Sequence, residues 1–341
     1  MPSSERRRFG SAWLVMGIFL IASGCAHRRA AGPQIVRDPR FETFLGLDGR
    51  PLLAKAEAQP APPPKLDVPA SPAQLPAADS AAGPYIAGAE RPNRYAIIIG
   101  IERYRDARVV PGAARDAQNF AVVARKTMGV AEAHMRVLLN EHATKSDVEN
   151  AFAWAGMRTN ARSEVFVFFA GHGSASADAN NKLQPLLFTF DGNPGESGSA
   201  LTLYSLLADL GRETKPQAVM AFIDACSENI VDKTRGGVVF AQKPLDVAIF
   251  SAASVGELSS PTSDGNSGVF TGRVLDAIGR GAADANGDAE ITLDELDEYV
   301  TNRVRRYATE QLGRRQTPVL VKHGRLASQK LVLAEGLSGA P

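Results

Sequence analysis

From Tyr95 onward the chain alternates between short, unbroken apolar runs and stretches with helical spacing of apolar residues. Unbroken runs rich in β-branched and aromatic residues are typical of strands buried on both faces of a parallel sheet. Such runs occupy residues 95–99, 165–169, 218–223, 247–250 and 319–321, and a similar run at 135–139 is interrupted by Arg136. The helical patterns between them occupy residues 113–128, 146–154, 203–210, 270–278 and 293–305. The alternation predicts an α/β domain with a mostly parallel central sheet and helices on both faces.

The first residues have the composition of a bacterial export signal. Three arginines at positions 6–8 precede an apolar run over residues 12–21, which is shorter than the roughly 20 residues that span a bilayer. Residues 22–25 (ASGC) resemble the lipobox of bacterial lipoproteins, although Ala22 stands where leucine is commonest. The resemblance implies a signal peptide over residues 1–24 and a lipid on Cys25. The alternatives are an ordinary signal peptide or an uncleaved anchor, with Cys25 incidental.

A lipid on Cys25 would attach the mature chain to a membrane of the bacterial cell envelope. The second mature position is Ala26 rather than aspartate. In enterobacterial lipoproteins this favours the outer membrane, so we expect the chain to face the periplasm from there. Residues 25–92 are rich in proline and alanine without apolar periodicity and are expected to form a semi-extended tether. The folded domain is then expected over residues 93–336, followed by a tail at 337–341.

Charge and cysteine content exclude several classes of function. Lysine and arginine number 38 against 37 aspartates and glutamates, so no excess of positive charge points to a nucleic-acid partner. Two cysteines, Cys25 and Cys226, can form at most one disulfide and do not make a disulfide scaffold. We find no glycine-rich phosphate loop and no CxxC pair, and therefore no case for nucleotide or zinc chemistry.

Two of the predicted strands end in reactive side chains. His172 follows residues 165–169 between two glycines, and Cys226 follows residues 218–223. In open parallel sheets, sites form beyond the carboxyl ends of the strands. If these strands are neighbours, the imidazole can take the proton of the thiol and later protonate a leaving amine. Taken singly, a cysteine at a strand end is more often a buried structural thiol, and a histidine is often a turn residue.

The motifs in this order resemble the caspase and metacaspase clan of cysteine peptidases. They comprise the strand at 95–100 followed by Ile101 and Tyr104, then residues 112–117 (GAARDA), 170–174 (AGHGS), 223–227 (IDACS) and 251–254 (SAAS) leading to 268–271 (GVFT). Cys226 lies 54 residues after His172, close to the caspase spacing of roughly 50. The resemblance implies an endopeptidase acting on protein or peptide substrates through His172 and Cys226, with no cofactor required. It also implies that the backbone amides of Gly173 and Cys226 bind the oxyanion.

Two acidic residues bear on which peptide bond is cut. By resemblance to metacaspases, Asp116 and Asp224 line the pocket for the residue before the scissile bond and prefer arginine or lysine. On local grounds Asp116 could instead cap a helix. The chain also departs from the metacaspase pattern, with Ala170 in place of a common serine and Ser227-Glu-Asn229 after the cysteine. The alternatives are thus a weak or inactive caspase-fold lipoprotein that serves as a binding or assembly module, or a different thiol hydrolase of the envelope.

Residues 284–295 have the oxygen-bearing side chains of a twelve-residue EF-hand calcium loop. The expected ligands are Asp284, Asn286, Asp288, the Glu290 carbonyl, Thr292 and Glu295. Position 6 is Ala289, where EF-hands have glycine because the turn needs a permissive backbone. The alternative is a turn between two helices in which Thr292 and Glu295 form a capping box. Calcium is therefore an expectation, separate from the peptide chemistry.

Overall fold

The structure is a computed structural model that describes residues 85–177, 183–213, 215–226, 245–254, 257–328 and 330–335. All of them belong to the unit Pro72–Pro341. The predicted signal peptide, Cys25 and most of the tether lie outside the described residues, as do Ser227–Asn229 and the tail. None of the described helices combines the length and the hydropathy that a membrane span requires.

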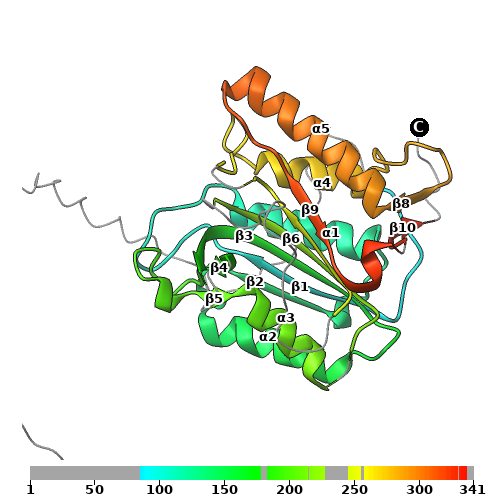
Figure 1. Cartoon of the computed structure of the whole chain (residues 1–341), viewed down its shortest axis with the longest axis horizontal. Helices are drawn as coiled ribbons and strands as arrows, with labels where there is room; N and C mark the ends of the chain where they lie inside the picture. The colour runs from blue at the N-terminus through cyan, green and yellow to red at the C-terminus, as the bar shows by residue number, and fades with distance from the viewer. Residues whose placement is uncertain are drawn as a thin grey trace, which may run out of the picture. The chain divides into compact units, whose positions relative to one another are not determined.

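An eight-stranded sheet runs through the described part of the chain, with six strands in the order β2-β1-β3-β6-β7-β9 (Figure 1). These strands are β1 (Arg94–Gly100), β2 (Met135–Leu139), β3 (Glu164–Ala177), β6 (Ala218–Cys226), β7 (Val247–Ser251) and β9 (Val319–Lys322). All neighbouring pairs are parallel except β7 and β9. Every apolar run that predicted a strand forms one, and the mostly parallel α/β fold is confirmed.

The sheet carries helices on both faces (Figure 1). The helices α1 (Ala113–Lys126), α4 (Val269–Gly279) and α5 (Leu293–Leu312) contribute to one apolar core. The helices α2 (Lys145–Arg158) and α3 (Leu203–Glu213) contribute to the other. Side chains of β1 alternate between these cores, with Ala96 and Ile98 in the first and Ile97 and Ile99 in the second. All four are fully buried, which explains why the strand reads as an unbroken apolar run.

Several short elements were not predicted. The last residues of β3 pair antiparallel with β4 (Leu183–Leu187), and β4 pairs antiparallel with β5 (Leu201–Thr202). A separate two-stranded sheet pairs β8 (Glu290–Thr292) with β10 (Val332–Glu335). Single-turn helices lie at η2 (Glu132–His134), η3 (Asn140–His142), η4 (Ser197–Ser199) and η5 (Gly324–Ala327). Such two- to five-residue strands are too short for a period-2 pattern to identify them.

The carboxyl ends of β1, β3 and β6 lie at one edge of the sheet because these central strands are parallel. The segment between β1 and α1 contains Tyr104 and Arg108, and the first turn of α1 contains Asp116. The ends of β3 and β6 contain the predicted His172 and Cys226. The fold therefore collects most of the predicted catalytic and substrate-binding residues at this edge.

Candidate active site

The backbones of His172 and Cys226 lie directly beside each other. They are partners in the register of the parallel strands β3 and β6, two positions beyond the pair Ala170 and Asp224. Neighbouring strands are separated by about 4.8 Å. The two strands are thus adjacent, as the sequence reasoning required.

The imidazole of His172 contacts a backbone carbonyl on the segment after β1. Its Nε2 atom lies 2.8 Å from the carbonyl oxygen of Arg108. A carbonyl oxygen can only accept, so a hydrogen bond here requires the proton on Nε2. In the neutral ring this leaves the lone pair on Nδ1, which is the atom free to act as a base. No residue pattern predicts this partner, because a backbone carbonyl is present at every residue.

Tyr104 holds both the backbone and the ring of His172. Its hydroxyl oxygen accepts a hydrogen bond from the His172 amide at 2.6 Å and donates to the Phe188 carbonyl at 3.3 Å. The two rings lie 4.8 Å apart between centroids, tilted by 47°. A Cβ atom on Gly171 would collide with the Tyr104 hydroxyl. The glycine before His172 is therefore required by the close approach of this tyrosine.

The Gly173 amide faces the cysteine-bearing strand. The Ala170 carbonyl accepts from the Ile101 amide at 2.9 Å, and the His172 carbonyl accepts from the Phe188 amide at 3.1 Å. Both carbonyls thus point to the β1 and β4 side of β3. Backbone groups alternate in direction along a strand, so the N–H of Gly173 points to the opposite side, toward β6.

A pocket of about 150 Å³ opens beside His172. Its walls come from five segments: the loop after β1, the start of α1, the ends of β3 and β6, and residues 259–268. The residues that line it are Val109, Val110, Pro111, Ala113, Asp116, Ala170, Gly171, His172, Asp224, Ser259, Ser260, Pro261 and Gly268. Both predicted acidic residues lie in this wall, and the two carboxylates are almost entirely buried, with 2% and 8% of the residue exposed.

Asp116 is held by the segment before α4. It accepts hydrogen bonds from the Ser267 hydroxyl at 2.5 Å and from the Gly268 amide at 2.7 Å. The cap position of α1 is Gly112, with φ of 83° and no side-chain cap. The alternative that Asp116 caps the helix is therefore wrong. The partners Ser267 and Gly268 were not predicted, because they lie 151 and 152 residues away in the sequence.

Asp224 is held by a different set of donors. One carboxylate oxygen accepts from the Ser259 hydroxyl at 2.6 Å. The other accepts from the hydroxyl and the amide of Thr271 at 2.6 and 3.2 Å. A Cβ atom on Gly268 would collide with this second oxygen, so only glycine fits between the two carboxylates.

Burial raises the pKa of both pocket carboxyl groups. The pKa of Asp116 is raised well above its ordinary value by burial and by the charge of Asp224, against the lowering effect of the hydrogen bonds from Gly268 and Ser267 and of the Arg115 charge. Burial also raises the pKa of Asp224, while hydrogen bonds from Ser259 and Thr271 lower it. Two buried acids at one pocket favour a cationic guest, because a positive charge stabilises the ionised form of both.

The predicted calcium ligands lie in a different part of the domain, in the loop between α4 and α5. Asp284, Asp288 and Glu295 can each offer a carboxylate oxygen to one point, with these atoms within 4.8 Å of one another. The capping box of Thr292 and Glu295 is also present at the start of α5. The cluster of carboxylates in the loop and the capping box of α5, which were alternatives in the sequence analysis, are thus both present.

Comparison with known proteins assigns the family. Residues 93–327 match the family model described as the caspase domain. Among solved structures, protein GSU0716 from Geobacter sulfurreducens is similar at 18% identity and a TM-score of 0.51, covering 68% of this chain and 94% of that one. Caspase-1 from Spodoptera frugiperda is similar at 13% identity and a TM-score of 0.48, covering 76% of this chain and 97% of that one. A search of curated proteins finds no significant match.

At 18% identity the likeness to the Geobacter structure concerns the fold alone. The family model spans well over half of the chain and includes the segments that contain His172 and Cys226. It ends at residue 327, a little before the end of the domain expected from the sequence. The chain belongs to the caspase domain family.

Proposed function

We propose that the chain is a cysteine endopeptidase that uses His172 and Cys226 and cleaves after arginine or lysine. The observation that supports this best is the pairing of His172 with Cys226 in the strand register, beside a pocket walled by two buried carboxylates. The caspase domain family contributes the reaction class, a thiol attack on a peptide bond.

In the proposed reaction His172 serves as base and then as acid. Nδ1 takes the proton of the Cys226 thiol, and the sulfur forms a bond to the substrate carbonyl carbon. The tetrahedral intermediate collapses as the imidazolium gives that proton to the leaving amine, which breaks the peptide bond and leaves a thioester. Water, deprotonated by the same imidazole, hydrolyses the thioester and restores the thiol. The Arg108 carbonyl supports this role because its hydrogen bond to Nε2 stabilises the imidazolium.

The oxyanion of the intermediate would be bound by the amides of Gly173 and Cys226. The direction of the Gly173 amide, toward the β6 side of β3, supports this assignment. Removing one such donor from an acyl-transfer enzyme typically costs about 10²- to 10³-fold in kcat.

The preference for arginine or lysine rests on the pocket's chemistry. Its outer wall carries Val109, Val110 and Pro111, which suit the aliphatic stem of a long basic side chain. Its inner wall carries Asp116 and Asp224, which suit the charged end. Ala170, which departs from the metacaspase pattern, also lines the pocket and adds no polar group there.

The test is a comparison of kcat/KM on fluorogenic peptides that differ only in the residue before the reporter: arginine, lysine, glutamine or aspartate. We expect cleavage of the arginyl and lysyl peptides, and a loss of at least about 10³-fold in Cys226→Ala and in His172→Ala. Activity that survives Cys226→Ala would show that another group performs the chemistry. A folded chain that binds the basic peptides without cleaving them would instead indicate a binding module.

We also propose that the peptidase is exported and anchored through a lipid on Cys25 at the outer membrane. The support is the order of arginines, apolar run and lipobox-like residues at 22–25, together with Ala26 after the cysteine. The proline- and alanine-rich tether would let the domain reach substrates away from its anchor.

A further inference from the structure

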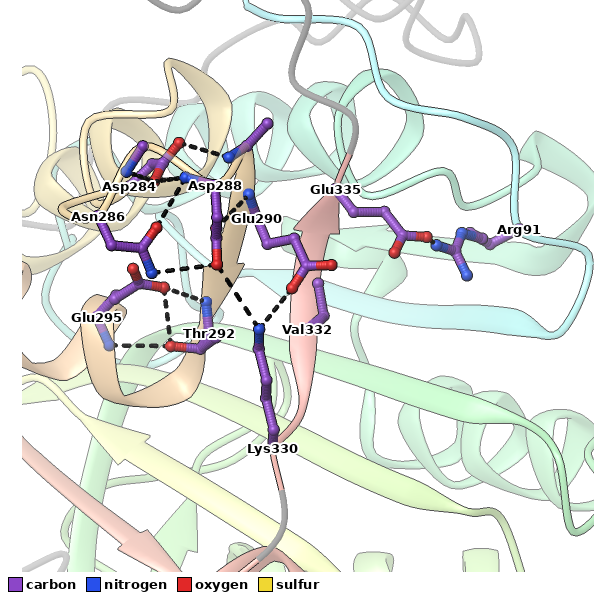
Figure 2. A network of polar contacts seen from close by, with 12 residues as sticks. Arg91, Asp284, Asn286, Asp288, Glu290, Thr292, Glu295, Lys330, Val332 and Glu335 are labelled. Carbon is purple, nitrogen blue, oxygen red and sulfur yellow. Dashed lines mark hydrogen bonds and ion pairs between the residues drawn. The ribbon is translucent and has the colours of Figure 1, made fainter.

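The loop between α4 and α5 folds around the side chain of its first residue, Asp284 (Figure 2). One oxygen of Asp284 accepts hydrogen bonds from the amides of Gly287 and Asp288 at 2.8 and 3.2 Å. The other accepts from the amide of Ala289 at 3.0 Å. Asn286 and Asp288 accept from the amides two residues after them, at 2.7 and 2.9 Å. The acidic side chains are thereby turned toward the inside of the loop.

The backbone at Ala289 has the conformation that the sixth position of such a loop requires. Its φ angle is 62°, in the left-handed region that residues other than glycine seldom adopt. Such a conformation costs alanine roughly 1–2 kcal/mol relative to right-handed geometry. The alanine at this position therefore does not prevent the loop from adopting its shape.

Glu295, the last residue of the loop, has an oxygen without a partner. Its Oε2 atom accepts from the amide and hydroxyl of Thr292 at 3.0 and 2.9 Å. Its Oε1 atom is fully buried and makes no hydrogen bond within the described part of the chain. A buried carboxylate oxygen without a hydrogen bond is costly, and such an atom calls for an ion or another donor. Glu295 also offers a carboxylate oxygen within 4.8 Å of oxygens from Asp284 and Asp288.

A nearby lysine neutralises only the outer side of this cluster. The Nζ atom of Lys330 lies 2.5 Å from a Glu290 carboxylate oxygen and 3.9 Å from Asp288 (Figure 2). In a loop of this type, residue 7 contributes its backbone carbonyl, so the pairing of the Glu290 side chain with Lys330 does not compete for that ligand. No ion pair to Asp284 or Glu295 is found among the described residues.

We propose that residues 284–295 bind one calcium ion through Asp284, Asp288 and Glu295, with Asn286, the Glu290 carbonyl and Thr292 completing the oxygen ligands. A set of carboxylate, amide and carbonyl oxygens that ends in a glutamate suits Ca²⁺, which accepts six to eight oxygens in flexible geometry. Mg²⁺ is smaller and demands octahedral geometry, so it should bind more weakly. The site is independent of the peptidase chemistry.

Calcium at this loop would stabilise two elements that meet there. The loop includes β8, which pairs with β10 near the end of the chain, and it leads directly into α5. Binding to the folded state alone raises the apparent stability by mass action. The calcium effect can therefore be measured as a shift of thermal unfolding as well as by binding.

The test is calorimetric titration of the full chain, freed of divalent cations by a chelator, with CaCl₂ and separately with MgCl₂. The chain carries Cys226→Ala, so that no proteolysis contributes heat and the result does not depend on the proposed peptidase. We expect one calcium per chain, with a dissociation constant of about 10⁻⁵ to 10⁻³ M, and a rise in Tm with calcium exceeding that with magnesium.

Two variants locate the site, and a third controls for the lost charge. Glu295→Gln removes a charged ligand but keeps an oxygen that can accept from the Thr292 amide. Asp288→Asn removes a charged ligand at an exposed position and keeps an oxygen that can accept from the Glu290 amide. Each should weaken calcium binding by at least about tenfold. Glu298→Gln, exposed on α5, should leave it unchanged. The proposal is overturned if millimolar calcium gives neither heat nor a Tm shift, or if all three variants bind like the parent chain.

Discussion

At the scale of single residues, the contacts around His172 explain why small and aromatic residues occur where they do. The Tyr104 hydroxyl occupies the space that a side chain on Gly171 would fill. It also bridges the His172 amide and the Phe188 carbonyl. Without the hydroxyl, these two groups, on β3 and on the residue after β4, would be placed to hydrogen-bond each other directly. Tyr104 is therefore a positioning residue for the proposed base.

Tyr104→Phe tests this role. The change keeps the ring against His172 but leaves its amide and the Phe188 carbonyl without the bridging hydroxyl, at a cost of about 1–3 kcal/mol for unsatisfied groups. We expect kcat on the arginyl peptide to fall by about tenfold or more while KM changes little. An equal rise in KM with unchanged kcat would mean that Tyr104 shapes the substrate pocket instead.

Asp116→Asn separates binding from stability. Losing one charged partner of a basic side chain should lower kcat/KM on arginyl peptides by roughly 10- to 100-fold, equivalent to about 1.5–3 kcal/mol. Glu149→Gln on the exposed face of α2 removes one charge without touching the pocket and serves as the control. We expect kcat/KM to fall on lysyl peptides as well as on arginyl peptides.

Asp116→Asn should stabilise the fold at neutral pH although it weakens substrate binding. Burial and the charge of Asp224 raise the pKa of Asp116, against the hydrogen bonds from Gly268 and Ser267 and the Arg115 charge, so the folded state binds a proton more tightly than the unfolded chain. The protonated carboxyl group of Asp116 therefore contributes to the free energy of unfolding in acid, and this contribution is lost as the pH rises through the raised pKa. Asp116→Asn should therefore raise the free energy of unfolding at neutral pH, with the gain vanishing in acid. A variant less stable than wild type at neutral pH would contradict this reading.

Sequence reasoning identified the residues at strand ends but not their partners. His172, Asp224 and Cys226 could be found because each follows a buried apolar run. Tyr104 was noted only as part of the family resemblance, and the Arg108 carbonyl and the Gly268 amide were not found at all. Contacts made by loop backbone depend on how distant segments pack, which no local pattern encodes.

At the scale of elements, the loop at residues 259–268, which completes the pocket, leads into α4 and contacts α5. The two arms of this loop pair through a bridge between Pro261 and Gly268, and the Thr262 amide donates to the Ser267 carbonyl at 2.8 Å. Its tip is held by Tyr307 on α5, whose hydroxyl accepts from the Ser263 amide at 3.1 Å. The helix pair thus supports Ser267 and Gly268, which hold Asp116.

Tyr307→Phe should loosen this loop without touching substrate. The change removes two hydrogen bonds of the Tyr307 hydroxyl, one from the Ser263 amide and one to the Ser263 hydroxyl. At about 0.5–1.5 kcal/mol each, their loss predicts a rise in KM for arginyl peptides of at least about fivefold, with kcat nearly unchanged. Tyr299→Phe on the same helix is the matched control and should leave KM as in wild type. If both variants behave alike, the tip of the loop does not govern the pocket.

Long elements could be predicted from the sequence and short ones could not. Five of the six principal strands contain continuous apolar runs, β2 contains a run interrupted by Arg136, and the helices α1 to α5 show clear periodicity. The helix α5 extends to Leu312, beyond the predicted residue 305, until Gly313 ends it with φ of 61°. The strands β4, β5, β8 and β10 depend on pairing with distant segments and have no pattern of their own.

At the scale of the whole molecule, the anchor and the domain can be tested separately. Cys25→Ala removes the proposed lipid attachment site but no residue of the caspase domain. We expect the chain to move from the membrane fraction to the soluble periplasmic fraction of the host, with kcat/KM on small peptides unchanged. Persistence in the membrane fraction would show that Cys25 is not the anchor and favour an uncleaved N-terminal segment.

The proposed pairing of Cys226 with His172 and the preference for basic residues can be tested together by covalent labelling of the full chain with chloromethylketones, read by mass spectrometry of the modified peptide. An arginyl reagent should modify Cys226 rapidly, and His172→Ala should slow that labelling by orders of magnitude. An aspartyl reagent of otherwise identical structure should react far more slowly. Faster labelling by the aspartyl reagent, or an arginyl adduct on any residue other than Cys226, would contradict the account.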